Sequence, residues 1–407
     1  MKTLVFRSID NLLSLQGAAL KQGRKIQEED LSIQSKAALV VQNGKIQWVG
    51  AEKSIPKSYA KNSKDIHLDA ATVLPGFVEC HTHTLFAGSR SAEFEMRLQG
   101  VSYQEIAKKG GGILSTVRET RKLPAAKLKF LTEEKVQNFT RQGVTTLEIK
   151  TGYALDEKNE VKSLQVIRSL ESPRIIPTFL GAHSVPPEFS NASAYLEYLQ
   201  ALLPKIRKLT NRLDIWIEKG FFEKNFSRVY LEKAKELGFQ IVIHADQLTL
   251  SGGTELAIDL QALSADHVIQ LGDAEIRKIA QSTTTAVLLP LADLYMKCAY
   301  PPARKLIDQG ARVALATDFN PGTCPSQDLA LVGLLARLEM KMSLPEVISA
   351  YTVGAAHALG MEERLGSLEV GKSADFASTS SDWTQLFYSA GAMGVEKTFL
   401  KGRLIRD

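Results

Sequence analysis

Short apolar runs alternate with longer amphipathic stretches between residues 73 and 320. Most of these runs are nearly continuous in apolar residues, which is typical of parallel strands that are buried on both faces. We expect eight strands, at residues 73–80, 145–149, 175–180, 214–217, 240–243, 265–269, 286–289 and 312–316. Eight alternations of strand and helix within roughly 250 residues predict an α/β protein with a (β/α)8 barrel, also called a TIM barrel.

The stretches between the expected strands have apolar residues at helical spacing. The expected helices are 133–141, 160–170, 195–208, 228–237, 254–263, 274–281 and 303–309. Gly143, Gly238 and Gly310 follow three of them, as expected for helix ends, because glycine readily adopts the left-handed conformation found there.

Both ends of the chain, outside the barrel, have the patterns of strands. Asn43-Gly44 predicts a hairpin turn in the N-terminal part, and Lys401-Gly402 is a weaker turn signal near the C-terminus. Neither end is long enough to bury a good core alone. We therefore expect residues 1–72 and 367–407 to form one small β-sandwich domain, with the barrel, residues 73–366, inserted between its halves.

The composition of the 407 residues narrows the class of protein. Hydrophobic residues make up 44% and charged residues 23%, as in ordinary globular proteins. The net charge of +5 comes from scattered residues, so no nucleic-acid partner is expected. Three widely spaced cysteines fit a reducing compartment. Without a signal peptide or a membrane-spanning segment, we expect a cytoplasmic protein with no membrane partner.

Reactive residues follow the expected strands at their carboxyl ends, where a barrel of this kind places its catalytic groups. In chain order they are His81 and His83, Glu148 and Lys150, His183, Glu218, His244 and Asp246, His267, and Asp318. This distribution predicts a functional site at that end of the barrel.

His81 and His83 lie two residues apart at a strand end, so both imidazoles point to the same side of the chain. Alone, the pair fits two structural histidines as well as two ligands of one cation. With His244 and Asp318 it gives three imidazoles and one carboxylate, a set that suits zinc or a similar divalent ion. Such an ion acidifies water, and Asp318 could accept the proton and pass it to a leaving nitrogen. The alternative for Asp318 is a turn residue.

His267 and His183 lie at two further strand ends. We expect His267 to donate a hydrogen bond that polarises a substrate carbonyl, with metal ligation or structural packing as alternatives. His183 lies just past the third expected strand, where substrate contact is favoured over metal ligation. A structural histidine is the alternative there.

Several motifs resemble a known superfamily. Residues 74–83, Leu-Pro-Gly-Phe-Val-Glu-Cys-His-Thr-His, resemble the opening of the amidohydrolase barrel, and residues 366–376 resemble the return of that superfamily into its β domain. Residues 148–153, 181–183 and 317–323 are similar to the imidazolonepropionase family within it. The resemblance spans most of the chain. It implies hydrolysis of 4-imidazolone-5-propanoate to N-formimidoyl-L-glutamate, in histidine degradation, by metal-activated water.

The resemblance also implies a cofactor and roles for particular residues. The cofactor is one divalent metal ion, zinc or iron, the partner is a small-molecule substrate, and a homodimer is compatible with the family. The implied metal ligands are His81, His83, His244 and Asp318. The implied substrate contacts are Arg90, Tyr153, His183, Asn320, Gly322 and Thr323.

Arg90 suits the propanoate tail of this substrate, because a guanidinium binds a carboxylate through two hydrogen bonds. An exposed arginine is the alternative. Tyr153 offers a phenol to either end of the substrate, or simple packing. Residues 84–112 form a long excursion, which we expect to cover the substrate and to bring Tyr103 over its ring. An ordinary helical insertion is the alternative.

Gln247 and two lysines bear on the mechanism. Gln247 stands where some family members carry glutamate; it can contact the substrate but cannot act as a base, so proton transfer falls to Asp318 and His267. Lys150 and Lys219 raise the alternative of a carbamylated lysine between two metals. Neither matches that role convincingly, so one metal is predicted.

Two other functions could use the same residues. An amidohydrolase-family deaminase of a purine, pyrimidine or related ring needs the same histidines and aspartate, but it releases ammonia. A non-catalytic metal-binding barrel is less favoured, because candidate ligands are intact at several strand ends.

Overall fold

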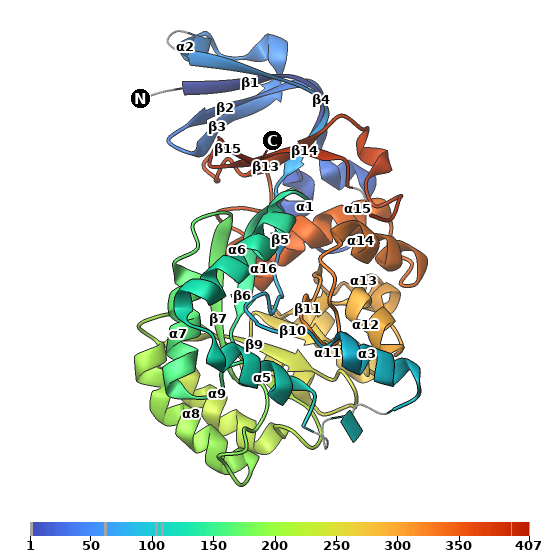
Figure 1. Ribbon diagram of the computed structural model, residues 1–407. Helices are drawn as coiled ribbons and strands as arrows, with labels where there is room; N and C mark the ends of the chain where they lie inside the picture. Colours follow the sequence, from blue (N-terminus) through green and yellow to red (C-terminus); the bar gives the residue numbers. More distant parts are fainter. Residues whose placement is uncertain (1–2, 61–62, 102–104, 107–109, 392, 407) are drawn as a thin grey trace.

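The computed structural model describes residues 3–60, 63–101, 105–106, 110–391 and 393–406 and consists of a barrel and a small sheet domain (Figure 1). The barrel strands are β5 (Phe77–Glu79), β6 (Val144–Lys150), β7 (Arg174–Ala182), β8 (Arg212–Ile217), β9 (Gln240–Ala245), β10 (Ser264–His267), β11 (Thr285–Leu288) and β12 (Val313–Leu315). Each pairs in parallel with the next in chain order. Nearly all their residues are buried, as the continuous apolar runs predicted.

The first and last barrel strands meet just beyond their carboxyl ends. Thr82 forms a parallel bridge with Phe319, whose carbonyl accepts the backbone N–H of His83 at 2.9 Å. The backbone N–H of Asp318 donates to the carbonyl of His81 at 3.2 Å. These contacts close the sheet, and the predicted (β/α)8 barrel is confirmed.

Helices follow the barrel strands and surround them. They are α3 (Ser91–Leu98), α5 (Ile113–Lys122), α6 (Ala125–Thr140), α7 (Glu157–Arg168), α8 (Ala192–Ile206), α9 (Lys224–Glu236), α10 (Gly253–Asp259), α11 (Asp273–Gln281), α12 (Pro290–Met296), α13 (Ala303–Gln309), α14 (Leu329–Leu338), α15 (Leu344–Ser349), the π-helical turn η3 (Ala350–Gly354) and α16 (Ala355–Ala358). Each expected helix overlaps one of these. Gly143, Gly238 and Gly310 have φ of 89°, 81° and 89°, which confirms their place at helix ends.

The first expected strand, 73–80, is wrong as a single strand. It is divided between β4 (Ser63–Pro75), in the small domain, and β5, in the barrel, with Gly76 between them. The N–H of Gly76 donates to the carbonyl of Asp375, and a β-carbon on Gly76 would lie 2.2 Å from a side-chain atom of Thr145. The chain therefore changes sheet at the one residue that leaves room for this approach.

The small domain is one seven-stranded sheet built from both ends of the chain. Its other strands are β1 (Thr3–Leu13), β2 (Ile33–Gln42), β3 (Lys45–Ala51), β13 (Phe376–Thr379), β14 (Val395–Leu400) and β15 (Arg403–Arg406), in the order β15-β14-β13-β4-β1-β2-β3. Short helices α1 (Gln16–Leu20), η1 (Glu28–Leu31), η2 (Glu52–Ser54), α2 (Lys57–Ala60) and η4 (Trp383–Gln385) connect these parts. The predicted hairpin turns at Asn43-Gly44 and Lys401-Gly402 are confirmed.

The two chain ends share one core in this domain. The ring of Phe6, in β1, lies 5.0 Å from that of Phe376 and 5.4 Å from that of Phe399, measured between centroids. The two ends also meet beside β3, where the N–H of Ile46 donates to the carbonyl of Lys372 at 2.9 Å. The expected boundaries of the domain, residues 1–72 and 367–407, stay a prediction.

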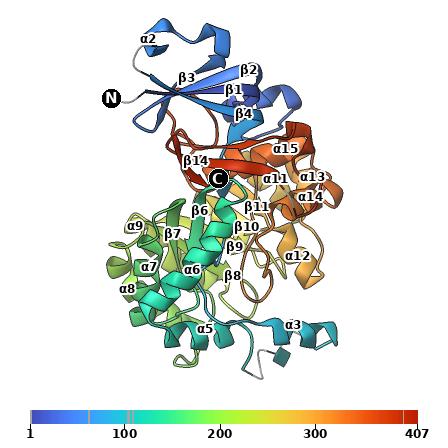
Figure 2. The ribbon, with the colours of Figure 1, turned by 45° about the horizontal axis from the view of Figure 1, so that its top comes forward.

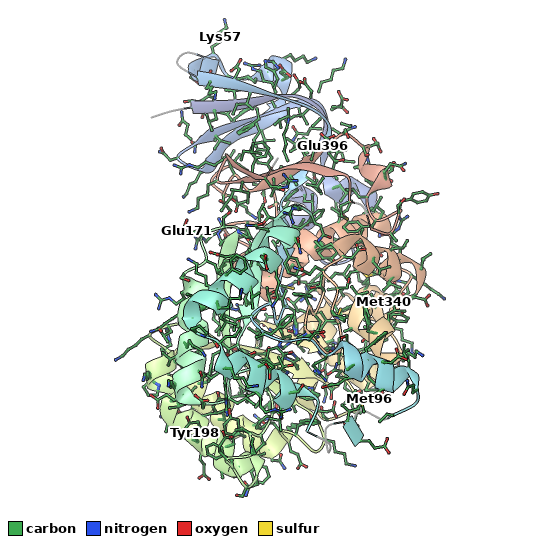
Figure 3. All side chains as sticks on the ribbon, in the orientation of Figure 1. Lys57, Met96, Glu171, Tyr198, Met340 and Glu396 are labelled. Atoms are coloured by element: carbon green, nitrogen blue, oxygen red, sulfur yellow. The ribbon has the colours of Figure 1, made fainter. Side chains whose placement is uncertain are left out.

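The segment after β5 lies apart from the small domain. In both ribbon views α3 and α5 lie on the side of the barrel away from the small sheet (Figure 2). Met96, on α3, lies on that side in Figure 3, whereas Glu396, on β14, lies in the small domain. Within the described part of the chain, no helix is long and apolar enough to cross a membrane.

Candidate active site

Three imidazoles meet at the carboxyl-terminal end of the barrel strands. His81 and His83 follow β5, and His244 lies in β9. Each offers one ring nitrogen as a ligand atom, and these three atoms lie within 4.8 Å of one another. Nε2 of His83 and Nε2 of His244 are 3.3 Å apart. The fold thus brings together the three histidines that the sequence indicated as metal ligands.

A carboxylate lies next to Nδ1 of two of these rings. Nδ1 of His81 lies 2.6 Å from Oδ2 of Asp266, and Nδ1 of His244 lies 3.0 Å from Oδ2 of Asp214. A ring held through Nδ1 presents Nε2 to a ligand. Nε2 of His81 is buried and has no hydrogen-bond partner among the described residues. This arrangement of donors fits a divalent cation.

His81 and His83 are in the form that binds metal. Burial lowers the pKa of His81 and of His83 well below the usual value, and neighbouring Lys150 and the other imidazoles lower it further. Both rings are therefore neutral near pH 7. A neutral imidazole has the lone pair that a cation needs.

Asp318 follows β12 and faces the same cluster. Its Oδ1 lies 3.5 Å from Nε2 of His81 and 3.4 Å from Nε2 of His83. Its backbone φ is positive, at 55°, which is unusual for a residue other than glycine. Burial raises the pKa of Asp318 to about 7, and His244 opposes that rise. Asp318 can therefore carry a carboxylate charge or a proton close to neutral pH.

His267 and His183 flank the cluster on different sides. The His267 ring lies 5.4 Å from that of His244, and its Nδ1 has no partner among the described residues. His183 stacks on His83 with ring centroids 5.0 Å apart, and its Nδ1 lies 2.9 Å from the carbonyl of Gly152. Burial lowers the pKa of His183 to about 3, so the ring is neutral. Since only Nδ1–H can donate to that carbonyl, Nε2 of His183 is an acceptor.

A cavity of about 450 Å³ opens over these residues. Its lining residues are His83, Arg90, Ile113, Tyr153, His183, Trp216, Phe221, His244, Gln247, Leu248, Thr249, His267, Met296, Asp318, Asn320 and Thr323. A cavity of this size holds a small metabolite, and its mixture of apolar walls with a few polar groups is typical of such sites.

Arg90 is the only lysine or arginine among the described residues that line this cavity. It is 7% exposed, and its Nε donates to Glu93 at 2.8 Å. Gly322 lies directly behind it: a β-carbon on Gly322 would come within 1.9 Å of Nη1 of Arg90. Gly322 thus makes room for the guanidinium rather than lining the cavity itself.

Asn320 and Thr323 line the cavity but also hold the loop after β12 in shape. Oδ1 of Asn320 accepts the backbone N–H groups of Gly322 and Thr323 at 2.9 and 2.7 Å. Nδ2 of Asn320 donates to the carbonyl of Asp318 at 2.7 Å. The side chain of Asn320 therefore fixes the backbone that carries Asp318, and substrate contact by Asn320 and Thr323 stays a prediction.

Three polar residues near the cavity make different contacts: Gln247, Glu218 and Asp246. Gln247 lines the cavity, and its Nε2 lies 3.7 Å from the sulfur of Met296. Glu218 accepts the backbone N–H of Leu248 at 2.8 Å and also the hydroxyl of Thr249. Asp246 accepts backbone N–H groups at the start of α10. Glu218 and Asp246 thus shape the loop after β9.

Neither lysine is placed to bridge two metals. Nζ of Lys150 lies 3.0 Å from Glu148 and 2.8 Å from Asp214, so it is held as an ammonium, which cannot be carbamylated. Lys219 is exposed at the surface.

Tyr153 lines the cavity with its ring 5.9 Å from that of His83. Tyr103 lies outside the described residues.

Four residues of the site were not predicted from the sequence: Asp214, Asp266, Trp216 and Phe221. Asp214 interrupts the apolar part of β8, and Asp266 directly precedes His267 in β10. A carboxylate within a buried strand is the signal that could have found them, since it needs a partner. The Trp216 and Phe221 rings lie 4.1 Å apart and form an aromatic wall of the cavity. Their apolar character resembled ordinary core packing.

The chain is similar in sequence to known proteins over nearly its whole length. Residues 72–405 match the amidohydrolase family. An imidazolonepropionase of Bdellovibrio bacteriovorus is 57% identical over 99% of this chain and 96% of the relative. Imidazolonepropionases of Kosmotoga olearia and Bacillus velezensis are 38% and 37% identical, over 99% and 98% of this chain and 98% and 96% of the relatives.

Solved structures share the fold at low sequence identity. An adenosine deaminase from Xanthomonas campestris with bound zinc gives a TM-score of 0.72 at 17% identity, over 99% of this chain and 92% of that one. A triazine hydrolase variant gives a TM-score of 0.73 at 14% identity, over 100% and 95%. At these identities the likeness shows the fold alone.

Proposed function

Because this chain belongs to the amidohydrolase family and, within it, to the imidazolonepropionases, we propose that its site hydrolyses 4-imidazolone-5-propanoate to N-formimidoyl-L-glutamate. The reaction opens a cyclic amide at its carbon–nitrogen bond, in the degradation of histidine. One observation carries the assignment: a single cavity has a divalent-cation site in its floor and Arg90 in its wall. A ring amide and a carboxylate tail need those two features.

We propose one metal ion, zinc or iron, with His81, His83, His244 and Asp318 as its ligands. When bound, such an ion supplies Lewis acidity that polarises a carbonyl and activates water for attack. The pairing of Lys150 with two carboxylates supports a site for one ion rather than two. A homodimer and a cytoplasmic location stay predictions.

Asp318 is the proton carrier in this proposal. It accepts a proton from the attacking water at a carboxylate oxygen and gives it to the ring nitrogen as the carbon–nitrogen bond breaks. Its position supports this role, because its Oδ1 lies 3.5 Å from Nε2 of His81 and 3.4 Å from Nε2 of His83, beside the place where water would be activated. Gln247 can orient the substrate through its amide but cannot share the base role.

Four other side chains orient the substrate. His267 donates to the carbonyl oxygen that gains charge, and Nε2 of His183 accepts from a ring N–H. Trp216 and Phe221 offer a flat apolar surface to the heterocycle and exclude water from that side. Tyr153 and Tyr103 remain candidates for contact with the ring or its tail.

The test is turnover by the metal-loaded protein with 4-imidazolone-5-propanoate. We expect the ring absorbance to fall while formimidoylglutamate forms in equal amount and no ammonia is released. Release of ammonia from a purine or pyrimidine, without action on the imidazolone, would replace this proposal with a deaminase. Absence of both reactions would exclude both enzymes.

Replacement of the cavity arginine, Arg90→Met, is expected to lower kcat/KM by about 10- to 100-fold, mostly through KM. Hydrogen bonds to a charged group contribute roughly 1.5–3 kcal/mol, and 1.4 kcal/mol is a factor of about ten. The matched control is a substrate whose tail is a carboxamide, for which the variant should lose far less. An equal loss with both substrates would show that Arg90 does not bind the carboxylate.

A further inference from the structure

Lys150 is the last residue of β6 and is 1% exposed. We propose that it is a positioning residue that fixes the two halves of the metal site relative to each other. The inference rests on the proposed role of His81, His83 and His244 as ligands.

Two sets of contacts, called arms here, connect Lys150 to the proposed ligands. The first arm leads to the His81-Thr82-His83 segment. Nζ of Lys150 donates to Oε1 of Glu148 at 3.0 Å, and Oε2 of Glu148 accepts the backbone N–H of Thr82 at 3.0 Å. Thr82 also donates its hydroxyl to the carbonyl of Glu148 at 2.7 Å. A single carboxylate therefore connects the ammonium to the backbone between two ligands.

The other arm leads to the third ligand. Nζ of Lys150 lies 2.8 Å from Oδ2 of Asp214, the same oxygen that lies 3.0 Å from Nδ1 of His244. Asp214 is fully buried in β8, so its carboxylate has no access to water. The ammonium offsets its charge and lies against the carboxylate oxygen that faces the imidazole.

Lys150 thus connects ligands from β5 and β9 through two carboxylates that would otherwise repel each other. Without it, Glu148 and Asp214 lose the cation between them, and the orientation of both His-bearing segments is less restricted. Partners behind metal ligands typically contribute about 10- to 100-fold to metal affinity.

The loss of the contacts of Lys150 and the loss of its charge are expected to change metal affinity in opposite directions. Removal of a nearby positive charge by itself strengthens the attraction of the site for a cation. Loss of the contacts loosens the ligands and weakens binding. A fall in metal affinity therefore points to positioning, because charge alone gives a rise.

Arg212 provides a matched control. It is a second buried cation of the barrel, 2% exposed, and it donates to the carbonyls of Leu359 and Ala358 at 2.9 and 3.1 Å. It lies near enough to Glu148 and Asp214 to feel their charge, but no ion pair joins it to either among the described contacts. Arg212→Met removes a buried charge from the same region without breaking the two arms.

The experiment measures the dissociation constant for Zn²⁺ by competition with a chromogenic chelator, on metal-free full-length protein. We expect Lys150→Met to bind Zn²⁺ about 10- to 100-fold more weakly, and Arg212→Met to bind it as tightly as the parent or more tightly. Asp214→Asn should also weaken binding, and the double variant Lys150→Met/Asp214→Asn should lose less than the product of the two single losses. Unchanged affinity in Lys150→Met, an equal loss in Arg212→Met, or fully multiplicative losses would overturn the inference.

If Lys150→Met does not fold, Glu148→Gln carries the test, since it keeps the size of the side chain and breaks the same arm. Parent-like Zn²⁺ affinity in Glu148→Gln would then overturn the inference, and a loss of about tenfold would support it. A parent protein that bound no divalent ion would instead overturn the proposed function together with this inference. A parent that bound Zn²⁺ but left the imidazolone intact would overturn only the proposed substrate.

Discussion

The Asp318→Asn variant is expected to lose about 10²- to 10⁴-fold in kcat, because it removes the group that moves the proton in the proposed reaction. The asparagine keeps the size of the side chain, so the loop after β12 should keep its shape. The amide can neither accept the proton of water nor return it to the ring nitrogen. The measurement is steady-state turnover with the bound metal quantified in the same sample.

A matched substitution separates this effect from the general cost of changing a buried aspartate. Asp293 is 1% exposed and does not line the cavity. Asp293→Asn should therefore keep kcat within a few-fold of the parent. Near-parent turnover in Asp318→Asn at full metal occupancy would exclude Asp318 as the proton carrier.

Removal of the metal ion is expected to abolish turnover, and addition of a divalent ion to the stripped protein should restore it. The residues of the cavity can bind and orient the substrate alone, but none of them provides the Lewis acidity that hydrolysis of an amide requires at neutral pH. Parallel reconstitution with Zn²⁺ and Fe²⁺, followed by measurement of kcat, also compares the two candidate ions.

The control for metal removal is substrate binding. The stripped protein should still bind the substrate, because Arg90 and the aromatic wall do not depend on the ion. Turnover that survived complete removal of the ion would refute the mechanism. Loss of binding together with loss of turnover would show that the ion also holds the substrate.

Much of the fold could be predicted because buried parallel strands have a simple pattern. The apolar runs located the strands, and the rule for carboxyl ends then placed His81, His83, His244 and Asp318 on one face. The division at Gly76 could not be predicted in this way. Apolar character continues through it, and the change of sheet depends on which strands pair with each side.

The contacts behind the ligands could not be predicted either. Asp214 and Asp266 reach His244 and His81 across the barrel, so their partners depend on the register of neighbouring strands rather than on spacing along the chain. The role of Lys150 is hidden for the same reason. The sequence raised Lys150 only as a carbamylated bridge between two metals, which was not favoured, whereas its ion pairs show a buried charge shared by two carboxylates.

The seam between β5 and β12 has a consequence for folding. The proposed ligands come from both sides of that seam, with His81 and His83 after the first barrel strand and Asp318 after the last. A bound ion would therefore link the segments that follow the first and the last barrel strands. It would stabilise only molecules in which the last strand has docked. A molecule that retained the ion would then be one in which all the strands of the barrel had assembled.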